Sequence, residues 1–260
     1  MKRGLLKTEA VILNSHDFGE SDRIISFYTR GHGRMSGIAK GARRSRKRFV
    51  GNLDVLSHIT LIFFRSGKSD LVRVEDAALI EGFAGLKSGI ERLSEACYLL
   101  ELVSEMTAEG QAMPSVFEML LEFIGMLDAG GETSVIMRAF EANLLSVLGY
   151  RPCLDVCVAC KKDYGQAERL FFSSEKGGAV CAGCAQGECG LIEITAGTAR
   201  FLAAAERIEA AKLVRLKPAQ AFLDESERLL YDFIRRQTGR ELKTKKFIGK
   251  LRNFQAAGGR

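Results

Sequence analysis

Residues 6–39 read LKTEAVILNSHDFGESDRIISFYTRGHGRMSGIA, and this stretch decides the fold of the N-terminal part. It holds three short segments rich in Val, Ile and Phe, separated by Asp, Gly and Ser residues that favour turns. Two similar segments follow it. The five predicted strands are Leu6–Asn14, Asp22–Tyr28, Gly33–Ala39, Ser57–Phe64 and Asp70–Ile80. Five short strands with a long connection after the third predict a small β-barrel, and their number and spacing suit an OB-fold.

From residue 88 onward, the apolar residues recur at helical spacing. Ser88-Gly-Ile-Glu91 has the form of a capping box, so a helix is expected to begin there. Five further helices are predicted at 114–127, 134–148, 196–213, 218–238 and 242–254. The fold class is therefore α+β and multidomain. The expected divisions are a barrel at 1–80, the first part of a helical domain at 81–150, a cysteine-rich insert at 151–194, and the second helical part at 195–260.

Six of the seven cysteines lie between residues 153 and 189. Four of them form two CxxC pairs, Cys157-Val-Ala-Cys160 and Cys181-Ala-Gly-Cys184, with twenty residues between the pairs. Each CxxC turn can present two sulfur atoms to one tetrahedral Zn²⁺ ion. Four cysteine ligands leave no open position for water or substrate, so the sequence predicts a structural zinc site rather than a catalytic one.

Two alternatives remain open for these cysteines at the level of sequence. The thiols could be free or redox-active, with no metal bound. In addition, Cys153 or Cys189 could replace one of the four ligands, because each lies within five residues of a CxxC pair.

Charge is distributed unevenly along the 260 residues, although the net charge is only +6. Residues 1–80 carry 15 Lys and Arg against 8 Asp and Glu, and residues 235–260 carry 9 against 1. The intervening residues carry 14 against 23. Two basic ends around an acidic middle favour an anionic polymer as partner. The alternative is a charged surface that contacts only solvent.

The densest basic segment is KGARRSRKR at residues 40–48, between the third and fourth predicted strands. A loop interrupted by Gly and Ser can follow a phosphate backbone without reading bases. Phe49 follows directly and could stack on a base, although a core position is the more common role for such an aromatic residue. The predicted DNA-binding residues are Lys40, Arg43, Arg44, Arg46, Lys47 and Arg48.

A second basic set lies near the C-terminus. In the helix predicted at 242–254, Leu242, Phe247 and Leu251 would form the buried side. The basic side could bind either nucleic acid or an acidic peptide, unless it is only a solvated helix end. The residues concerned are Arg235, Arg236, Lys243, Lys245 and Lys246.

Signatures of catalysis are weak, and we expect no enzyme. The three histidines lie in the β part, without the spacing of a metal or triad motif. Gly67-Lys68-Ser69 resembles the end of a phosphate-binding loop, but Ile62 stands where the first glycine is required. Asp17, Glu20 and Asp22 occupy a predicted turn without a nearby histidine or cysteine. No apolar run is long enough for a membrane span or a signal peptide, so a cytoplasmic location is expected.

With these features placed, the chain resembles the RecO family of bacterial DNA repair proteins. The resemblance covers nearly the whole length and rests on four stretches that occur in this order. They are TEAVILNSHDFGESDRIISFYTRGHGRMSGIAKGARRSRKRFVGNL at 8–53, LLSVLGYRPCLDVCVAC at 144–160, FFSSEKGGAVCAGC at 171–184 and RELKTKKFI at 240–248. Some family members lack the cysteines, whereas this sequence retains both pairs.

The resemblance implies an N-terminal OB-fold and a C-terminal helical domain that carries the zinc module. It also implies binding to single- and double-stranded DNA, annealing of complementary strands, and action with RecR in the RecF pathway at the nucleoid. Further implied partners are the acidic tail of single-stranded DNA-binding protein and, indirectly, RecA, whose loading at gaps is promoted. Two hypotheses compete with this one. The first is a zinc-stabilised transcription or translation factor that binds nucleic acid without annealing it. The second is a metal- or thiol-dependent enzyme, which would need an open coordination site or a cysteine of low pKa.

Overall fold

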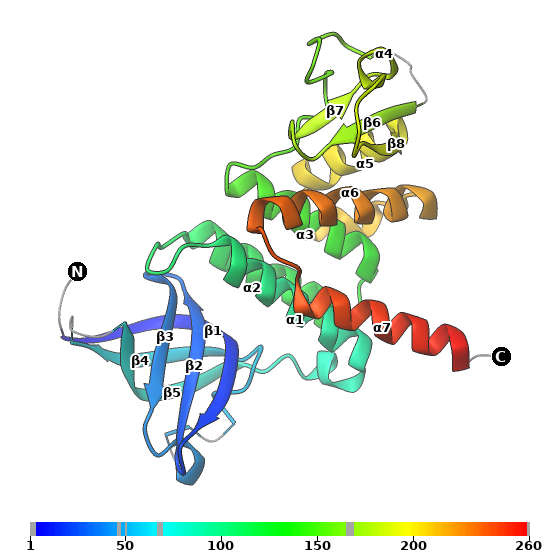
Figure 1. Ribbon diagram of the computed structural model, residues 1–260. Coiled ribbons are helices and arrows are strands. Elements are labelled where there is room, and N and C mark those ends of the chain that lie inside the picture. Colours follow the sequence, from blue (N-terminus) through cyan, green and yellow to red (C-terminus); the bar gives the residue numbers. More distant parts are fainter. Residues whose placement is uncertain (1–3, 46–47, 50, 67–69, 165–168, 259–260) are drawn as a thin grey trace. The chain divides into compact units, whose positions relative to one another are not determined.

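The computed structural model describes residues 4–45, 48–49, 51–66, 70–164 and 169–258, and Figure 1 shows the course of the chain. Two compact units are present: the first comprises Met1–Ala129 and Phe247–Arg260, and the second comprises Gly130–Lys246. The strands are β1 (Gly4–Phe18), β2 (Asp22–Thr29), β3 (Gly33–Ala39), β4 (His58–Arg65), β5 (Leu71–Glu81), β6 (Arg169–Ser173), β7 (Gly178–Val180) and β8 (Ile192–Thr195). The α-helices are α1 (Ile90–Met106), α2 (Pro114–Asp128), α3 (Thr133–Val147), α4 (Ala182–Ala185), α5 (Ala196–Arg207), α6 (Gln220–Thr238) and α7 (Lys243–Gly258). Short 3-10 helices are η1 (Ala42–Arg44), η2 (Ala84–Ser88) and η3 (Ala210–Arg215).

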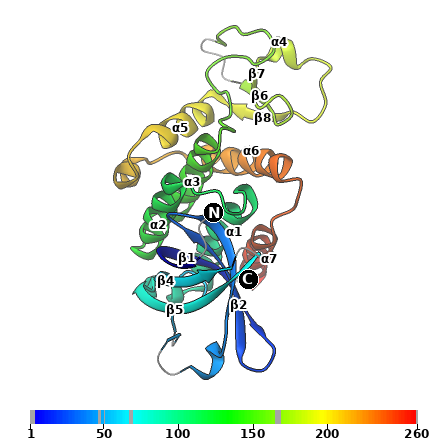
Figure 2. The same ribbon diagram turned by 90° about the vertical axis from the view of Figure 1, so that its left-hand side faces the viewer.

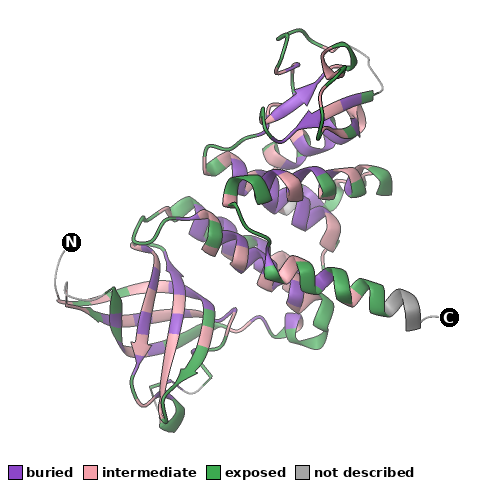
Figure 3. Ribbon diagram, viewed as in Figure 1, coloured by how far each residue is buried: buried purple, intermediate pink, exposed green. Residues whose placement is uncertain are grey.

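The first unit begins with a closed barrel of five strands in the order β1-β2-β3-β5-β4. Strand β1 pairs with both β2 and β4, and β3 and β5 are the parallel pair. Alternate apolar residues from the strands fill the interior, among them Ile12, Phe27 and Phe63. Figure 3 colours the buried segments of the strands purple. The predicted five-stranded OB-like barrel is confirmed.

Strand β1 is longer than predicted, because it continues past a bulge between Ile12 and Asn14 as far as Phe18. A bulge strengthens the local twist and re-aims the strand beyond it. The extension carries the acidic turn between β1 and β2 beyond the body of the barrel.

Helices α1 and α2 complete most of the described remainder of the first unit. The predicted capping box is wrong: Gly89 takes the N-cap position of α1, and the Ser88 hydroxyl donates to the Gly85 carbonyl at 2.6 Å. Ser88 is the last residue of η2, which directly precedes α1, and its hydroxyl is therefore bonded within η2. Helix α2 begins with Pro114 at its first turn, as predicted.

Helix α2 covers one part of the outer surface of the barrel. The Arg30 guanidinium lies 2.6 Å from the Glu118 carboxylate. The His58 ring meets the edge of Phe117 at a centroid distance of 5.9 Å. Because His58 begins β4, these contacts lie at the opposite end of that strand from Phe64.

In the second unit, a three-stranded sheet of order β7-β6-β8 joins helices α3, α5 and α6, as seen in Figure 2. Strand β8 leads directly into α5, where the Thr195 hydroxyl accepts the Thr198 N–H and caps the helix. The Glu225 carboxylate of α6 accepts the Thr195 N–H at 2.8 Å. The helix predicted at 196–213 is split, because α5 ends at Arg207 and η3 follows.

Helix α7 spans the division between the two units. Leu242 and Ile248 are buried, whereas Phe247 is 47% exposed. The predicted burial of Phe247 is wrong because the apolar side of the helix runs through its neighbour Ile248. Within the described part of the chain, no helix has both the length and the apolar character that a membrane span requires.

Candidate metal centre and nucleic-acid interface

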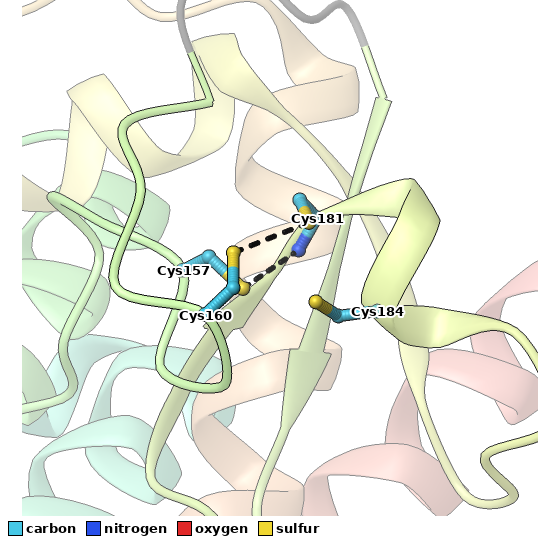
Figure 4. Close-up of side chains that lie close together, drawn as sticks. All are labelled: Cys157, Cys160, Cys181 and Cys184. Atoms are coloured by element: carbon cyan, nitrogen blue, oxygen red, sulfur yellow. Dashed lines mark hydrogen bonds between the residues drawn. The ribbon is translucent and has the colours of Figure 1, made fainter.

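The four cysteines of the CxxC pairs lie together beside the small sheet of the second unit (Figure 4). Their sulfur atoms all lie within 4.8 Å of one another. The first pair lies in the loop before β6, and the second begins where β7 ends and α4 starts. The structure thus brings together the residues that the spacing selects, namely Cys157, Cys160, Cys181 and Cys184.

Backbone pairing holds the first cysteine loop against β7. The Cys153 N–H donates to the Gly177 carbonyl at 2.9 Å, and the Ala179 N–H donates to the Cys153 carbonyl at 2.8 Å. The Val158 N–H donates to the Ala179 carbonyl at 2.8 Å. A Cβ atom on Gly178 would lie 2.3 Å from the Val158 side chain and 2.6 Å from the Cys153 carbonyl oxygen. Only glycine therefore allows this close approach of the two segments.

Hydrogen bonds within the cluster shift the pKa values of Cys157 and Cys184 in opposite directions. Burial opposes ionisation of Cys157, but the backbone N–H groups of Cys160, Cys181 and Ala159 outweigh it and lower the pKa of Cys157 to about 6. Hydrogen bonds with the side chains of Cys181 and Cys160 raise the pKa of Cys184 to about 12. The Cys157 sulfur therefore ionises more readily than an ordinary thiol, and the Cys184 sulfur less readily. Four cysteine sulfurs this close together form the donor set that a structural Zn²⁺ site uses, so the residues fit this ion.

The two remaining cysteines of the insert lie outside the cluster that the described residues form. The Cys153 thiol lies 3.8 Å from the Val156 carbonyl oxygen, and Cys189 is exposed. The arrangement offers no support for either residue as a substitute ligand.

The basic segment lies between β3 and β4, where the sequence places it. Helix η1 forms its first part and is anchored by the buried Ala42, while the Arg44 side chain remains 73% exposed. The described members of the predicted DNA-binding set are Lys40, Arg43, Arg44 and Arg48, whereas Arg46 and Lys47 lie outside the described residues.

The acidic turn between β1 and β2 lies against this basic segment. The Arg43 guanidinium is 3.3 Å from the Asp17 carboxylate, and the Arg44 guanidinium is 3.6 Å from that of Glu20. The Arg43 backbone N–H donates to the Ser21 carbonyl at 2.9 Å. The acidic residues therefore order the basic segment, a role that their sequence positions alone did not indicate.

Asp22 fixes the start of the basic segment. Its carboxylate accepts the Gly41 N–H at 2.9 Å and the Ser21 hydroxyl at 3.0 Å. These two hydrogen bonds, that from Gly41 first, hold the pKa of Asp22 below its usual value. The carboxylate is thus ionised at neutral pH and keeps the chain at Gly41 attached to the β1–β2 turn.

Arg48 joins the end of the basic segment to β5. Its guanidinium donates to the Glu75 carbonyl at 3.5 Å and to the Lys40 carbonyl at 3.4 Å. The same group lies 5.0 Å from the ring centroid of Phe49, which is buried. Phe49 is therefore a core residue, not a surface for stacking on bases.

The C-terminal basic set is largely engaged in ion pairs. Arg235 lies 3.1 Å from Asp232, and Arg236 lies 3.7 Å from Glu175. Lys245 contacts the Glu227 carboxylate and is only 16% exposed. Lys243 and Lys246 are exposed at the start of α7. The five residues therefore differ in their exposure and surroundings and do not form one uniform cationic surface.

Both parts of the chain match family models. Residues 1–83 match the model described as "Recombination protein O N terminal", and residues 87–246 match "Recombination protein O C terminal". The chain belongs to the RecO family. The predicted family is therefore confirmed, and this family consists of DNA repair mediators rather than enzymes.

Curated RecO proteins resemble the chain over almost its whole length. A DNA repair protein RecO from Syntrophus aciditrophicus is 32% identical over 254 residues, which cover 97% of this chain and 98% of that protein. RecO from Anaeromyxobacter sp. strain K is 33% identical, with 95% and 96% covered. RecO from Pelotomaculum thermopropionicum is 31% identical, with 98% of each chain covered.

The acidic turn is not among the site residues predicted from the sequence. The signal was present: the run HDFGESD at 16–22 ends one predicted strand and begins the next, and the basic segment begins after the third. In an antiparallel meander, the first and third strands run in the same direction, so their C-terminal ends lie at the same end of the sheet. Opposite charges at the two positions could therefore have been paired from the sequence.

Proposed function

We propose that this RecO-family chain binds single-stranded DNA through the basic segment of its barrel and anneals complementary strands. The observation that carries the proposal is the exposure of Lys40, Arg43, Arg44 and Arg48 on one side of a closed OB-like barrel. Cations in this segment would neutralise phosphates and release counterions, and the affinity would fall steeply with salt. The repulsion between two DNA strands would be lowered in the same way, while base pairing would supply specificity.

The partners implied for the family complete this proposal. We propose that the protein acts with RecR and holds the acidic tail of single-stranded DNA-binding protein, which raises its local concentration at covered gaps. RecA loading would follow at those gaps, in the cytoplasm at the nucleoid. Double-stranded DNA would contact the same phosphate-binding segment.

Zinc has a structural role in this proposal. Cys157, Cys160, Cys181 and Cys184 would hold one Zn²⁺ ion, which cross-links the loop before β6 to the end of β7. Elemental analysis of the purified protein is expected to give about one zinc atom per chain. A metal-free preparation that folds normally would contradict the assignment.

The proposal is tested by annealing oligonucleotides precoated with the cognate single-stranded DNA-binding protein, at about 50 and 200 mM salt. Wild-type protein is expected to anneal coated strands, faster at the lower salt, and to lose this activity when the tail of the coating protein is removed. The double variant Arg43→Glu/Arg44→Glu should not anneal. Lys212→Glu/Arg215→Glu, which makes the same change in net charge on η3, should behave as wild type.

The opposing outcomes are clear. Annealing by the Arg43→Glu/Arg44→Glu variant at low salt would exclude the basic segment as the DNA surface. Binding to bare DNA without annealing of coated strands would favour a general nucleic-acid-binding factor.

A further inference from the structure

The outer surface of the barrel carries an exposed aromatic ring beside the basic segment. Phe63 points into the core, and its neighbour Phe64 therefore points outward on β4, where 37% of it is exposed. Exposure of Phe64 contrasts with the burial of Phe27, Phe49 and Phe63 in the same barrel. The ring is thus available to a ligand while its backbone is held in the sheet.

Phe64 lies in a row that continues across the neighbouring strands. The strand register places Leu5 of β1 opposite Phe64 on one side and Arg73 of β5 opposite it on the other. Ile38 of β3 pairs with Arg73, and Ile24 of β2 pairs with Ile38. All five side chains lie on the outer face, so the row is mainly apolar with one cation in its middle.

Arg73 makes Phe64 a composite platform. The guanidinium lies 5.5 Å from the centroid of the Phe64 ring, and it also pairs with the Glu75 carboxylate. A guanidinium beside a phenyl ring presents a planar, cationic and aromatic surface. Unpaired bases can stack on such a surface, whereas the faces of bases in a duplex are covered by the neighbouring base pairs.

The basic segment reaches the same place on the barrel. Arg48 donates to the carbonyl of Glu75, two residues beyond Arg73 on β5. Two residues along a strand and one strand across amount to about 8 Å, which is close to the spacing of one nucleotide in an extended strand. A phosphate at the basic segment and its base at Phe64 are therefore compatible with one continuous path.

We propose that Phe64 and Arg73 form a stacking platform for an unpaired base of single-stranded DNA, next to the proposed phosphate contacts of Lys40, Arg43, Arg44 and Arg48. This inference rests on the proposed function and adds to it a preference for single strands. Phosphate contacts alone do not distinguish single strands from duplexes, whereas a stacking platform does.

The absence of tryptophan from the sequence gives a direct test. In Phe64→Trp, the new indole is the only one in the chain, and stacking on a base quenches its fluorescence. Leu79→Trp is the matched control. Leu79 is exposed, as Phe64 is, but it lies on β5 about 20 Å along the strand from Arg73. Each variant is titrated with unlabelled oligothymidylate and with a duplex of equal length, while anisotropy of a labelled strand measures binding independently.

We expect single strands to quench the indole of the Phe64→Trp variant but not that of Leu79→Trp, and the duplex to quench neither. Phe64→Ala should weaken single-strand binding by about tenfold and duplex binding by less than about twofold, with an unchanged melting temperature. Normal DNA binding by Phe64→Trp without quenching, or equal quenching of both variants, would overturn the platform and leave the proposed function intact. No binding by wild type at low salt would overturn both.

Discussion

At the scale of single residues, the ion pairs of Arg43 and Arg44 fix the position of the basic segment. The partners Asp17 and Glu20 are at least half exposed, and exposed ion pairs of this kind contribute only about 0–1 kcal/mol each. In the proposed complex, a DNA phosphate would therefore replace either carboxylate at small cost. We expect the acidic turn, which pairs with the arginines in the free protein, to compete with phosphate for them.

This competition predicts a gain of function. The double variant Asp17→Asn/Glu20→Gln should bind single-stranded DNA about threefold to tenfold more tightly at 50 mM salt, because two competing charges are removed. The gain should shrink at 200 mM salt. Anisotropy titrations measure it, with Glu109→Gln/Glu122→Gln as the control of equal net charge. Weaker binding than wild type would show that the turn positions the arginines more than it competes for them.

Lys245 illustrates the opposite case, a basic residue with a structural role. It contacts the Glu227 carboxylate, and its ammonium lies 5.8 Å from the centroid of the Tyr231 ring. Lys245→Ala is expected to lower the free energy of unfolding by about 1–2 kcal/mol, since the half-buried Glu227 carboxylate loses one basic partner, although it keeps Arg138 at 3.5 Å. Lys246→Ala should change it by less than about 0.5 kcal/mol. Denaturant titrations compare the two, and equal stabilities would contradict the assignment.

At the scale of elements, the sheet of the cysteine module depends on one close approach. Gly178→Ala would force a methyl group against Val158 and the Cys153 carbonyl. The first cysteine loop would have to move away from β7, which separates the CxxC pairs. We expect at least about tenfold weaker zinc binding, measured by competition with a chelating dye. Gly183→Ala has open space around its methyl group and should bind zinc normally. Equal affinities would show that the pairs do not depend on this pairing.

The elements show which kinds of signal the sequence carries. The glycine-bounded segment Gly33–Ala39 was predicted with its observed bounds, because alternation and turn residues are local signals. The N-cap of α1 differs from the predicted one, because the Ser88 hydroxyl donates to a carbonyl within η2. Phe247 was misplaced because one residue decides which side of a helix is buried, and that depends on tertiary packing. The cysteine cluster was predictable since metal chemistry imposes its own spacing.

At the scale of the whole chain, the sequence indicated the barrel, the helical part and the positions of the basic segment and the cysteines. It did not indicate which groups would meet. The contacts of Arg43 with Asp17, and of Arg73 with Phe64, depend on strand register around a closed barrel. Register follows from the bulges in β1 and between β4 and β5, and these are set by packing.

The division of the chain into two compact units predicts how metal removal should act on the whole molecule. The cysteine cluster lies in the second unit, and the basic segment lies in the first. Two hydrogen bonds hold the cysteine module to the rest of the second unit. The Glu225 carboxylate accepts the Thr195 N–H, and the Asp232 carboxylate accepts the Ser174 hydroxyl. Loss of the cross-link should therefore destabilise residues 130–246, with a fall of about 10 °C or more in their melting temperature.

Binding of single-stranded DNA at 25 °C should change by less than about twofold in the same chelator-treated sample, because the proposed phosphate-binding residues belong to the first unit. Thermal melting followed by circular dichroism and anisotropy titrations provide the two readouts, and added zinc should restore the melting temperature. A parallel loss of DNA affinity would mean that the units are energetically coupled. An unchanged melting temperature with metal fully removed would instead mean that the cysteine cluster does not stabilise the fold.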